Sequence, residues 1–230
     1  MNSGAVSLIL ADSRFPGGGH VHSGGLEEAV ERGIIRGIGD LPPFLSGRLR
    51  SAGELAAVFA AAAAHAAARG VPSGHWTTLD VELDARTPSA AQREASRAQG
   101  RGTARAAKAG WPSSALRDLL TATPRPHHPV ILGAITGVGG GRPVDAAATA
   151  AYLAVSGPAS AAVRLLGLDP LAVNGAVADL SRALDDVAER AATHAGLDPR
   201  HLPAPGAPAL DLFAEAHLRH HKEEVRLFAS

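Results

Sequence analysis

Apolar residues recur every three or four positions along most of the chain, and this spacing predicts helices. The clearest case begins at Asp169, a good N-cap, which is followed by Pro170 at the first helical position. Gly196 is a natural stop for this helix. The apolar positions fall on one face: Val177, Leu180, Leu184, Val187 and Ala191. We therefore predict one long helix between Pro170 and Gly196.

The same pattern predicts helices through the rest of the sequence. The segment "TTLDVELDA" alternates weakly, as a strand would, but no second strand is evident to pair with it, so a helix is favoured there. The predicted ranges are 4–11, 25–36, 40–50, 53–69, 74–85, 88–107, 113–122, 129–138, 143–155, 158–167 and 208–224. The fold class predicted is all-α.

The segments between these helices are short and carry glycine or proline. The longest connector is the proline-rich segment 202–208, which leads to the C-terminal helix. No internal repeat is visible. We expect a single all-helical domain over 1–230, a bundle of roughly ten helices, with a mobile N-terminal loop and a flexible C-terminal tail at 225–230.

Composition supports a helical protein and removes several classes of function. Apolar residues make up 46% of the 230 positions but aromatic residues only 3%, which suits close packing of small side chains between helices. Lys+Arg and Asp+Glu both total 22, and no basic stripe stands out, which argues against nucleic acid and favours association with proteins. The absence of cysteine excludes disulfides, thiolate metal sites and cysteine nucleophiles.

The start of the chain, "MNSGAVSLILADSR", has no basic region before its apolar run, and Asp12 interrupts that run. This is not the pattern of a secretory signal. The longest apolar run, "LAAVFAAAAAHAAA", is mainly alanine and too short to predict a membrane span. We expect a cytoplasmic protein without a membrane partner.

The stretch "RFPGGGHVHSGGLEEAV" (14–30) holds five glycines and two histidines in its first twelve residues. It has no lysine for a phosphate loop, and no strand precedes it for a dinucleotide fold. His20 and His22 lie on one side of an extended segment and could share a metal, with a third ligand from Asp12 or Glu27. The plainer interpretations are two loop histidines and a glycine-shaped helix start that places acids in the first turn.

The C-terminal segment "EAHLRHHKEEVRLFAS" offers a second pair of histidines. His217 and His221 are four residues apart and lie on one helical face, a spacing that can hold a metal. The glutamate between them that a metalloprotease needs is absent, and a solvated helix end is the favoured interpretation. Leu227 and Phe228 stand at the open end of the chain, where apolar residues often dock.

Two central segments look structural by themselves. In "EASRAQG" (94–100), Glu94 and Arg97 form an i, i+3 surface pair of little energetic value. In "HHPVILG" (127–133), a helix begins with Pro129, and His127 and His128 are most simply a pair in a loop. No catalytic order, paired-carboxylate signature or cofactor fingerprint stands out, so the sequence predicts neither an enzyme nor a bound cofactor.

Together these pieces resemble the UreF family of urease accessory proteins. The first match is carried by Ser13, Pro16, Gly18, Ser23, Gly25, Leu26 and Glu27. The segments "EASRAQG", "HHPVILG" and the terminal "RLFAS" (226–230) resemble further family motifs, in the expected order. One departure is that His20 and His22 stand where many members carry aromatic residues.

The resemblance implies an all-helical protein that is not itself an enzyme. It implies a scaffold and chaperone for GTP-dependent nickel insertion into apo-urease, which bridges the accessory protein UreD/UreH and the GTPase UreG, regulates GTP hydrolysis and forms a homodimer within the complex. The partner-binding residues it implies are His20, His22, Ser23, Gly25, Leu26, Glu27, Arg97, Gln99, Gly100, Arg226, Leu227, Phe228 and Ser230.

Two other classes of function stay open at this point. One is a protein that binds and handles nickel through its eleven histidines, with His20, His22, His217 and His221 as the candidate ligands. The other is a helical hydrolase whose site the sequence does not reveal.

Overall fold

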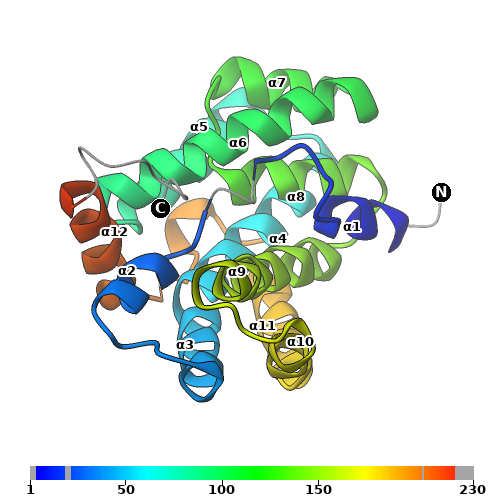
Figure 1. Cartoon of the computed structure of the whole chain (residues 1–230). Helices are drawn as coiled ribbons and strands as arrows, with labels where there is room; N and C mark the ends of the chain where they lie inside the picture. The colour runs from blue at the N-terminus through cyan, green and yellow to red at the C-terminus, as the bar shows by residue number, and fades with distance from the viewer. Residues whose placement is uncertain (1–3, 19–21, 204, 221–230) are drawn as a thin grey trace.

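The computed structural model describes residues 4–18, 22–203 and 205–220 (Figure 1). All regular secondary structure in these residues is helical, and none of them lies in a strand. The predicted all-α fold class is therefore confirmed, including a helix at "TTLDVELDA", which falls within α5.

The α-helices follow one another with short connections. Their bounds are α1 Gly4–Ala11, α2 Leu26–Glu31, α3 Leu41–Arg48, α4 Glu54–Arg69, α5 Ser73–Ala85, α6 Ala90–Gly110, α7 Ser114–Ala122, α8 His128–Val138, α9 Pro143–Leu166, α10 Pro170–Ala178, α11 Ser181–Thr193 and α12 Pro208–His220. Short 3-10 turns lie at Ile38–Asp40 (η2) and Pro199–His201 (η4), and a π-helical turn at Leu49–Gly53 (η3).

The alanine-rich helix α4 is the centre of the hydrophobic core. It packs against α8, α9 and α11, and runs through the middle of the molecule in Figure 1. Its residues 57–64 are all buried, because alanine lets neighbouring helices approach on several sides at once. The apolar run noted in the sequence is therefore a core helix.

Two glycines of α8 set how closely it lies against α4. A Cβ atom added at Gly133 would stand 2.1 Å from the carbonyl oxygen of Ala60, and one at Gly137 would stand 2.3 Å from that of Ala64. Both spacings are four residues, so the same faces meet over two successive turns. The backbones of α4 and α8 are in contact at Gly133 and Gly137, and a larger residue at either position would push the two helices apart.

Helix α9 is continuous, where the sequence predicted two helices over 143–155 and 158–167. Pro158 lies inside it and lacks the N–H that would bond the carbonyl of Ala154. The Arg48 side chain replaces that donor: its Nε lies 2.7 Å from the Ala154 oxygen, and its Nη1 lies 2.6 Å from the oxygen of Gly24. Arg48 thus donates to the carbonyl that Pro158 leaves without a donor, and it links α9 to Gly24 of the segment 14–30, which we call the opening segment. Burial lowers the pKa of Arg48 to about 10.

Two other helix predictions need correction. The single helix expected between Pro170 and Gly196 is divided into α10 and α11 by a turn at Asp179 and Leu180. The bend lets α10 pack against α3 and α9 while α11 packs against α4 and α9. In contrast, the gap expected between 40–50 and 53–69 is bridged by the π-helical turn η3, so the chain stays helical from α3 into α4.

Two helical segments are long and apolar enough to cross a membrane by length and composition alone. They are Ile38–Arg69 and Pro143–Leu166, and in their most apolar windows 67% and 61% of the residues are buried inside the protein. Core helices of soluble proteins show the same pattern.

Candidate functional site

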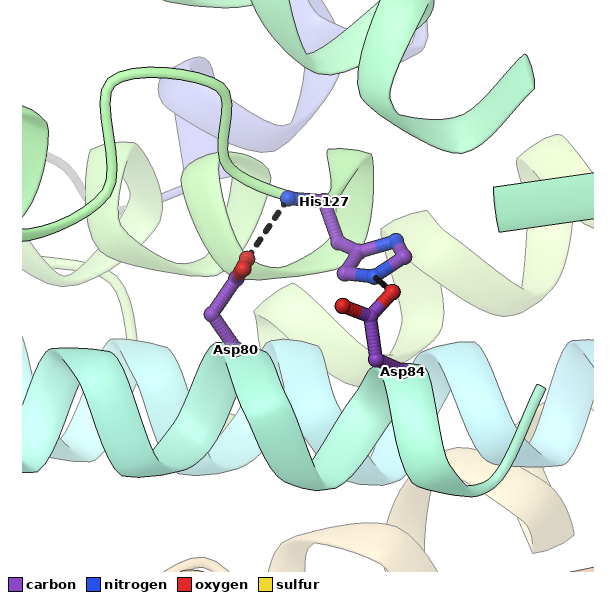
Figure 2. Close-up of side chains that lie close together, drawn as sticks. All are labelled: Asp80, Asp84 and His127. Carbon is purple, nitrogen blue, oxygen red and sulfur yellow. Dashed lines mark hydrogen bonds and ion pairs between the residues drawn. The ribbon is translucent and has the colours of Figure 1, made fainter. Parts of the chain in front are cut away.

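A cluster of charged side chains joins three distant segments of the chain. Helix α5 supplies Asp80 and Asp84, one turn apart, α6 supplies Arg97, and His127 stands directly before α8. We call these four residues the polar junction. Figure 2 shows both carboxylates rising from one helix toward His127.

Each carboxylate of the polar junction bonds both to Arg97 and to His127. The Oδ2 atoms of Asp80 and Asp84 accept from the Nη1 and Nη2 atoms of Arg97 at 2.8 and 2.6 Å. The Oδ1 atom of Asp80 accepts from the backbone N–H of His127 at 2.8 Å. The Oδ1 atom of Asp84 lies 2.8 Å from Nε2 of the His127 ring. The guanidinium fork therefore spans the pair of carboxylates on α5.

The surroundings of the junction favour the ionised forms of Asp84 and Arg97 and the neutral form of His127. Burial alone would raise the pKa of Asp84, but hydrogen bonds from His127 and Arg97 outweigh it, so the pKa lies below its ordinary value. Burial would lower the pKa of Arg97, and the two aspartates more than offset that effect. Burial dominates at His127 and lowers its pKa, which favours the neutral ring.

The ligand atoms of Asp80, Asp84 and His127 lie within 4.8 Å of one another, as a metal site would require. Their chemistry here argues against a metal. All four carboxylate oxygens already face protein donors, and Arg97 places a positive charge against the same oxygens that a cation would need. The junction is therefore a structural joint between α5, α6 and the start of α8.

The segment "EASRAQG" builds this joint together with "HHPVILG". Ser96 Oγ lies 3.0 Å from Nδ1 of His127 and accepts the backbone N–H of His128 at 3.2 Å. At Gly100, a Cβ atom would stand 2.0 Å from the carbonyl oxygen of Pro126, so α6 touches the loop before α8. Two motifs about thirty residues apart thus meet in one contact, whereas Gln99 is half-buried and lines a neighbouring cavity.

Two sequence interpretations are corrected by this geometry: the surface pair of Glu94 with Arg97, and the placing of both His127 and His128 in a loop. Glu94 does not pair with Arg97: it accepts from Arg125 Nη2 at 2.7 Å, while Arg97 reaches across to α5. His127 does lie in the loop directly before α8, but only 1% of it is exposed. His128 is the first residue of α8, and burial, aided by the neighbouring His22, lowers its pKa to about 3.

Helix α2, at the end of the opening segment, lies against the C-terminal helix α12 (Figure 1). Gly25 adopts a φ of 88°, which favours glycine, and packs beside Leu210 and Phe213 of α12. The motif residues Ser23, Leu26 and Glu27 are buried, and Glu27 Oε2 lies 3.8 Å from Nδ1 of His217. The expected solvated helix end is therefore wrong at His217, which is 2% exposed.

A cavity of about 510 Å³ opens between the opening segment, α6, α9 and α12. Its walls include His22, Arg48, Gln99, His128 and Leu210. His22 therefore lies near the start of α8, whereas His217 lies at α2. In the described part of the chain, neither histidine belongs to a group of three ligand atoms that could hold a metal.

Several predicted site residues lie outside the described residues. They are His20, His221, Arg226, Leu227, Phe228 and Ser230, together with the predicted tail 225–230. Asp80 and Asp84 were not among the predicted site residues, and His127 was predicted only as a loop residue. A signal for the aspartates was present in "LDVELD", where two acids four residues apart lie on one helical face.

Comparison with known proteins gives the same family throughout. The UreF family model matches residues 35–181. Over 230 residues, and the full length of both chains, the sequence is 42% identical to a urease accessory protein UreF of Mycolicibacterium vanbaalenii. It is 44% identical over 223 residues to that of Mycobacterium sp. strain JLS, covering 97% of each chain, and 42% identical over 233 residues to that of Mycobacterium tuberculosis strain H37Rv, covering all of each chain.

A helical protein with buried family motifs and a full-length match of this kind is a urease accessory protein. The chain belongs to the UreF family.

Proposed function

We propose that the protein is a cytoplasmic scaffold and chaperone for GTP-dependent nickel insertion into apo-urease. In this role it bridges a UreD/UreH-type accessory protein and a UreG-type GTPase, regulates GTP hydrolysis, contacts the urease apoprotein and forms a homodimer within the complex. It catalyses no reaction itself and needs no cofactor. Full-length similarity to urease accessory proteins supports this proposal.

The structural observation that carries the proposal is the contact between α2 and α12. It brings the N-terminal family motif beside the helix that leads into the C-terminal motif. Ser23, Leu26 and Glu27 are buried there, so we assign them to the shape of this surface rather than to direct contact. A partner that contacts both α2 and α12 therefore meets two neighbouring helices.

The predicted contact residues divide between two elements under this proposal. His20, His22 and Gly25 of the opening segment and Arg226, Leu227, Phe228 and Ser230 of the tail serve the UreD/UreH-type partner. Arg97 and Gly100 act indirectly, because they hold α6 against the start of α8, while the half-buried Gln99 lies beside them.

Deletion of residues 223–230 tests the proposal. We expect the truncated chain to lose capture of the UreD/UreH-type protein in co-purification, while its helical circular dichroism stays that of the full chain. A chain with the same eight residues in scrambled order is the matched control for length and charge, and it should lose capture as well. Undiminished capture by the truncated chain would contradict the role of the tail.

Nickel handling by histidines makes a different prediction. It requires tight, stoichiometric nickel binding by the isolated full chain, lost in His20→Ala/His22→Ala or His217→Ala/His221→Ala variants. We expect calorimetry to detect only weak binding in the unmodified chain.

A further inference from the structure

Helix α6 carries a row of positive charges at intervals of four residues. Arg93, Arg97, Arg101 and Arg105 form the row, and Lys108 lies close to it. At 100° per residue these five positions fall within an arc of roughly 120°. This row was not singled out as a basic stripe in the sequence.

The first half of the row is neutralised inside the molecule. Arg97 bonds to Asp80 and Asp84 of α5, and Arg93 Nε lies 3.8 Å from Asp84 Oδ1. The Nη1 atom of Arg93 also donates to the carbonyl oxygens of Thr87 and Pro88 at 2.7 and 2.8 Å. Two carboxylates spaced one helical turn apart thus cover two arginines with the same spacing.

The second half of the row has no such cover. Arg101, Arg105 and Lys108, which we call the cationic strip, are exposed. None of the three forms an ion pair with another residue in the described ranges. Beyond Glu94, α6 itself contains no acidic residue, so its own side chains supply no counter-charge.

We propose that the cationic strip binds an acidic helix of a protein partner, with carboxylates repeated every four residues. Helix α5 already binds the first half of the row in this way, because its Asp80 and Asp84 bond to Arg97. We infer that a partner helix binds the second half in the same manner. Successive carboxylates on such a helix are about 6 Å apart, which matches the rise between Arg101 and Arg105. The inference rests on the proposed function, because it places this helix within the urease-maturation complex.

The dimensions of the strip favour a protein segment over a nucleic acid or a membrane. Three charges over about 10 Å of helix give few phosphate contacts, and the chain has zero formal net charge. Helix α6 contains no aromatic residue on which bases could stack, and its exposed face offers no large apolar side chain to a bilayer. A short acidic helix can bind the strip without many charge contacts, an aromatic residue or an apolar face.

The triple variant Arg101→Glu/Arg105→Glu/Lys108→Glu tests the inference in the full chain. The probes are the purified UreD/UreH-type protein, the UreG-type GTPase, apo-urease and the assembled complex, each measured by biolayer interferometry. We expect binding of at least one probe to weaken about tenfold or more at low salt, because three attractions become repulsions. The loss should shrink at high salt, and Arg101→Gln/Arg105→Gln/Lys108→Gln should lie between the two.

The matched control is Arg69→Glu/Arg117→Glu/Arg182→Glu, which makes the same change in charge at exposed positions on other elements. It should bind every probe as the unmodified chain does, and circular dichroism should be unchanged in all variants. Carbodiimide coupling in the assembled complex provides a second measurement, since Lys108 should crosslink to an acidic residue of a partner.

The outcomes separate the two proposals. If the unmodified chain binds no probe, the proposed function fails and this inference fails with it. If the unmodified chain binds but the Glu triple variant binds every probe equally well, only the inference fails. If the triple variant loses affinity for a DNA duplex or for phosphatidylserine vesicles while protein binding is unchanged, the strip serves that ligand and the inference is overturned.

Discussion

Helix α8 is held in two different ways, along its body and at its start. Along its body, Gly133 and Gly137 bring its backbone against the carbonyls of Ala60 and Ala64, with no polar side chain involved. At its start, the polar junction fixes it through two carboxylates, a guanidinium and an imidazole. One contact depends on the absence of side chains, and the other depends on charge.

This difference decides what each contact tolerates. The glycine contact is insensitive to pH and salt but leaves no space for an added methyl group. The polar junction depends on charge instead, because the loss of Arg97 leaves the buried carboxylate of Asp80 without its cation. Size should therefore break the first contact, and charge or protonation the second.

The largest effect is expected from Gly133→Ala. The new Cβ would stand 2.1 Å from the Ala60 carbonyl oxygen, so α4 and α8 must separate. We expect the free energy of unfolding to fall by about 3 kcal/mol, despite the better helix propensity of alanine. Urea denaturation followed by circular dichroism measures this loss.

Gly175→Ala is the matched control, because Gly175 also lies inside a helix and a Cβ there meets no atom within 4 Å. It should stabilise the protein by about 0.5–1 kcal/mol. If Gly133→Ala behaved like Gly175→Ala, the close approach of α4 and α8 would not be a constraint.

A smaller loss is expected when charge is removed from the polar junction. Arg97→Met keeps most of the side-chain volume but leaves Asp80, whose side chain is 5% exposed, without its cation. We expect the free energy of unfolding to fall by about 2–3 kcal/mol. The loss is smaller than for a fully buried ion pair, because Asp84 is partly exposed to solvent. Arg125→Met removes the exposed ion pair with Glu94 and should change stability by no more than about 0.5 kcal/mol. Equal effects of the two substitutions in urea would show that the junction contributes no more than a surface pair.

The two contacts also differ in how far the sequence predicts them. Helix positions follow from local apolar spacing, which is why α4 through α8 were placed to within a few residues. The polar junction joins residues 13 to 47 positions apart, and local spacing carries no information about such partners. Single-sequence reasoning therefore assigned Arg97 to its neighbour Glu94, although its true partners lie on another helix.

Burial was predicted less well for polar residues than for apolar ones. His217 was placed on a solvated helix end and His127 in a loop, but both side chains are nearly inaccessible in the fold. A break between two helices was predicted before Pro158, which lacks a backbone N–H. Its helix continues because Arg48, more than a hundred positions away, supplies the missing donor to Ala154.

The smallest effect distinguishes the two contacts by pH. The half-buried His128 has a pKa lowered to about 3, and the pKa of His127 is lowered as well, both mainly by burial. The unfolded chain therefore binds more protons than the folded one below the ordinary histidine pKa near 6.5, and stability falls as pH falls through that value. From pH 7.5 to 5 we expect His128 to contribute a loss on the order of 1–2 kcal/mol.

Urea denaturation at intervals between pH 7.5 and 5 measures this dependence. The lowered pKa of Asp84 affects stability only near and below its ordinary value of 3.8. Within the window, burial also lowers the pKa of His75, which adds to the loss, and raises the pKa of Asp211, which acts in the opposite direction. His128→Asn should flatten the dependence, because its side chain cannot take up the proton. Gly133→Ala should lower stability at every pH while leaving the slope of the unmodified chain, since the α4–α8 contact contains no titrating group. An unchanged slope in His128→Asn would mean that the histidine at the start of α8 is not the group that acid disturbs.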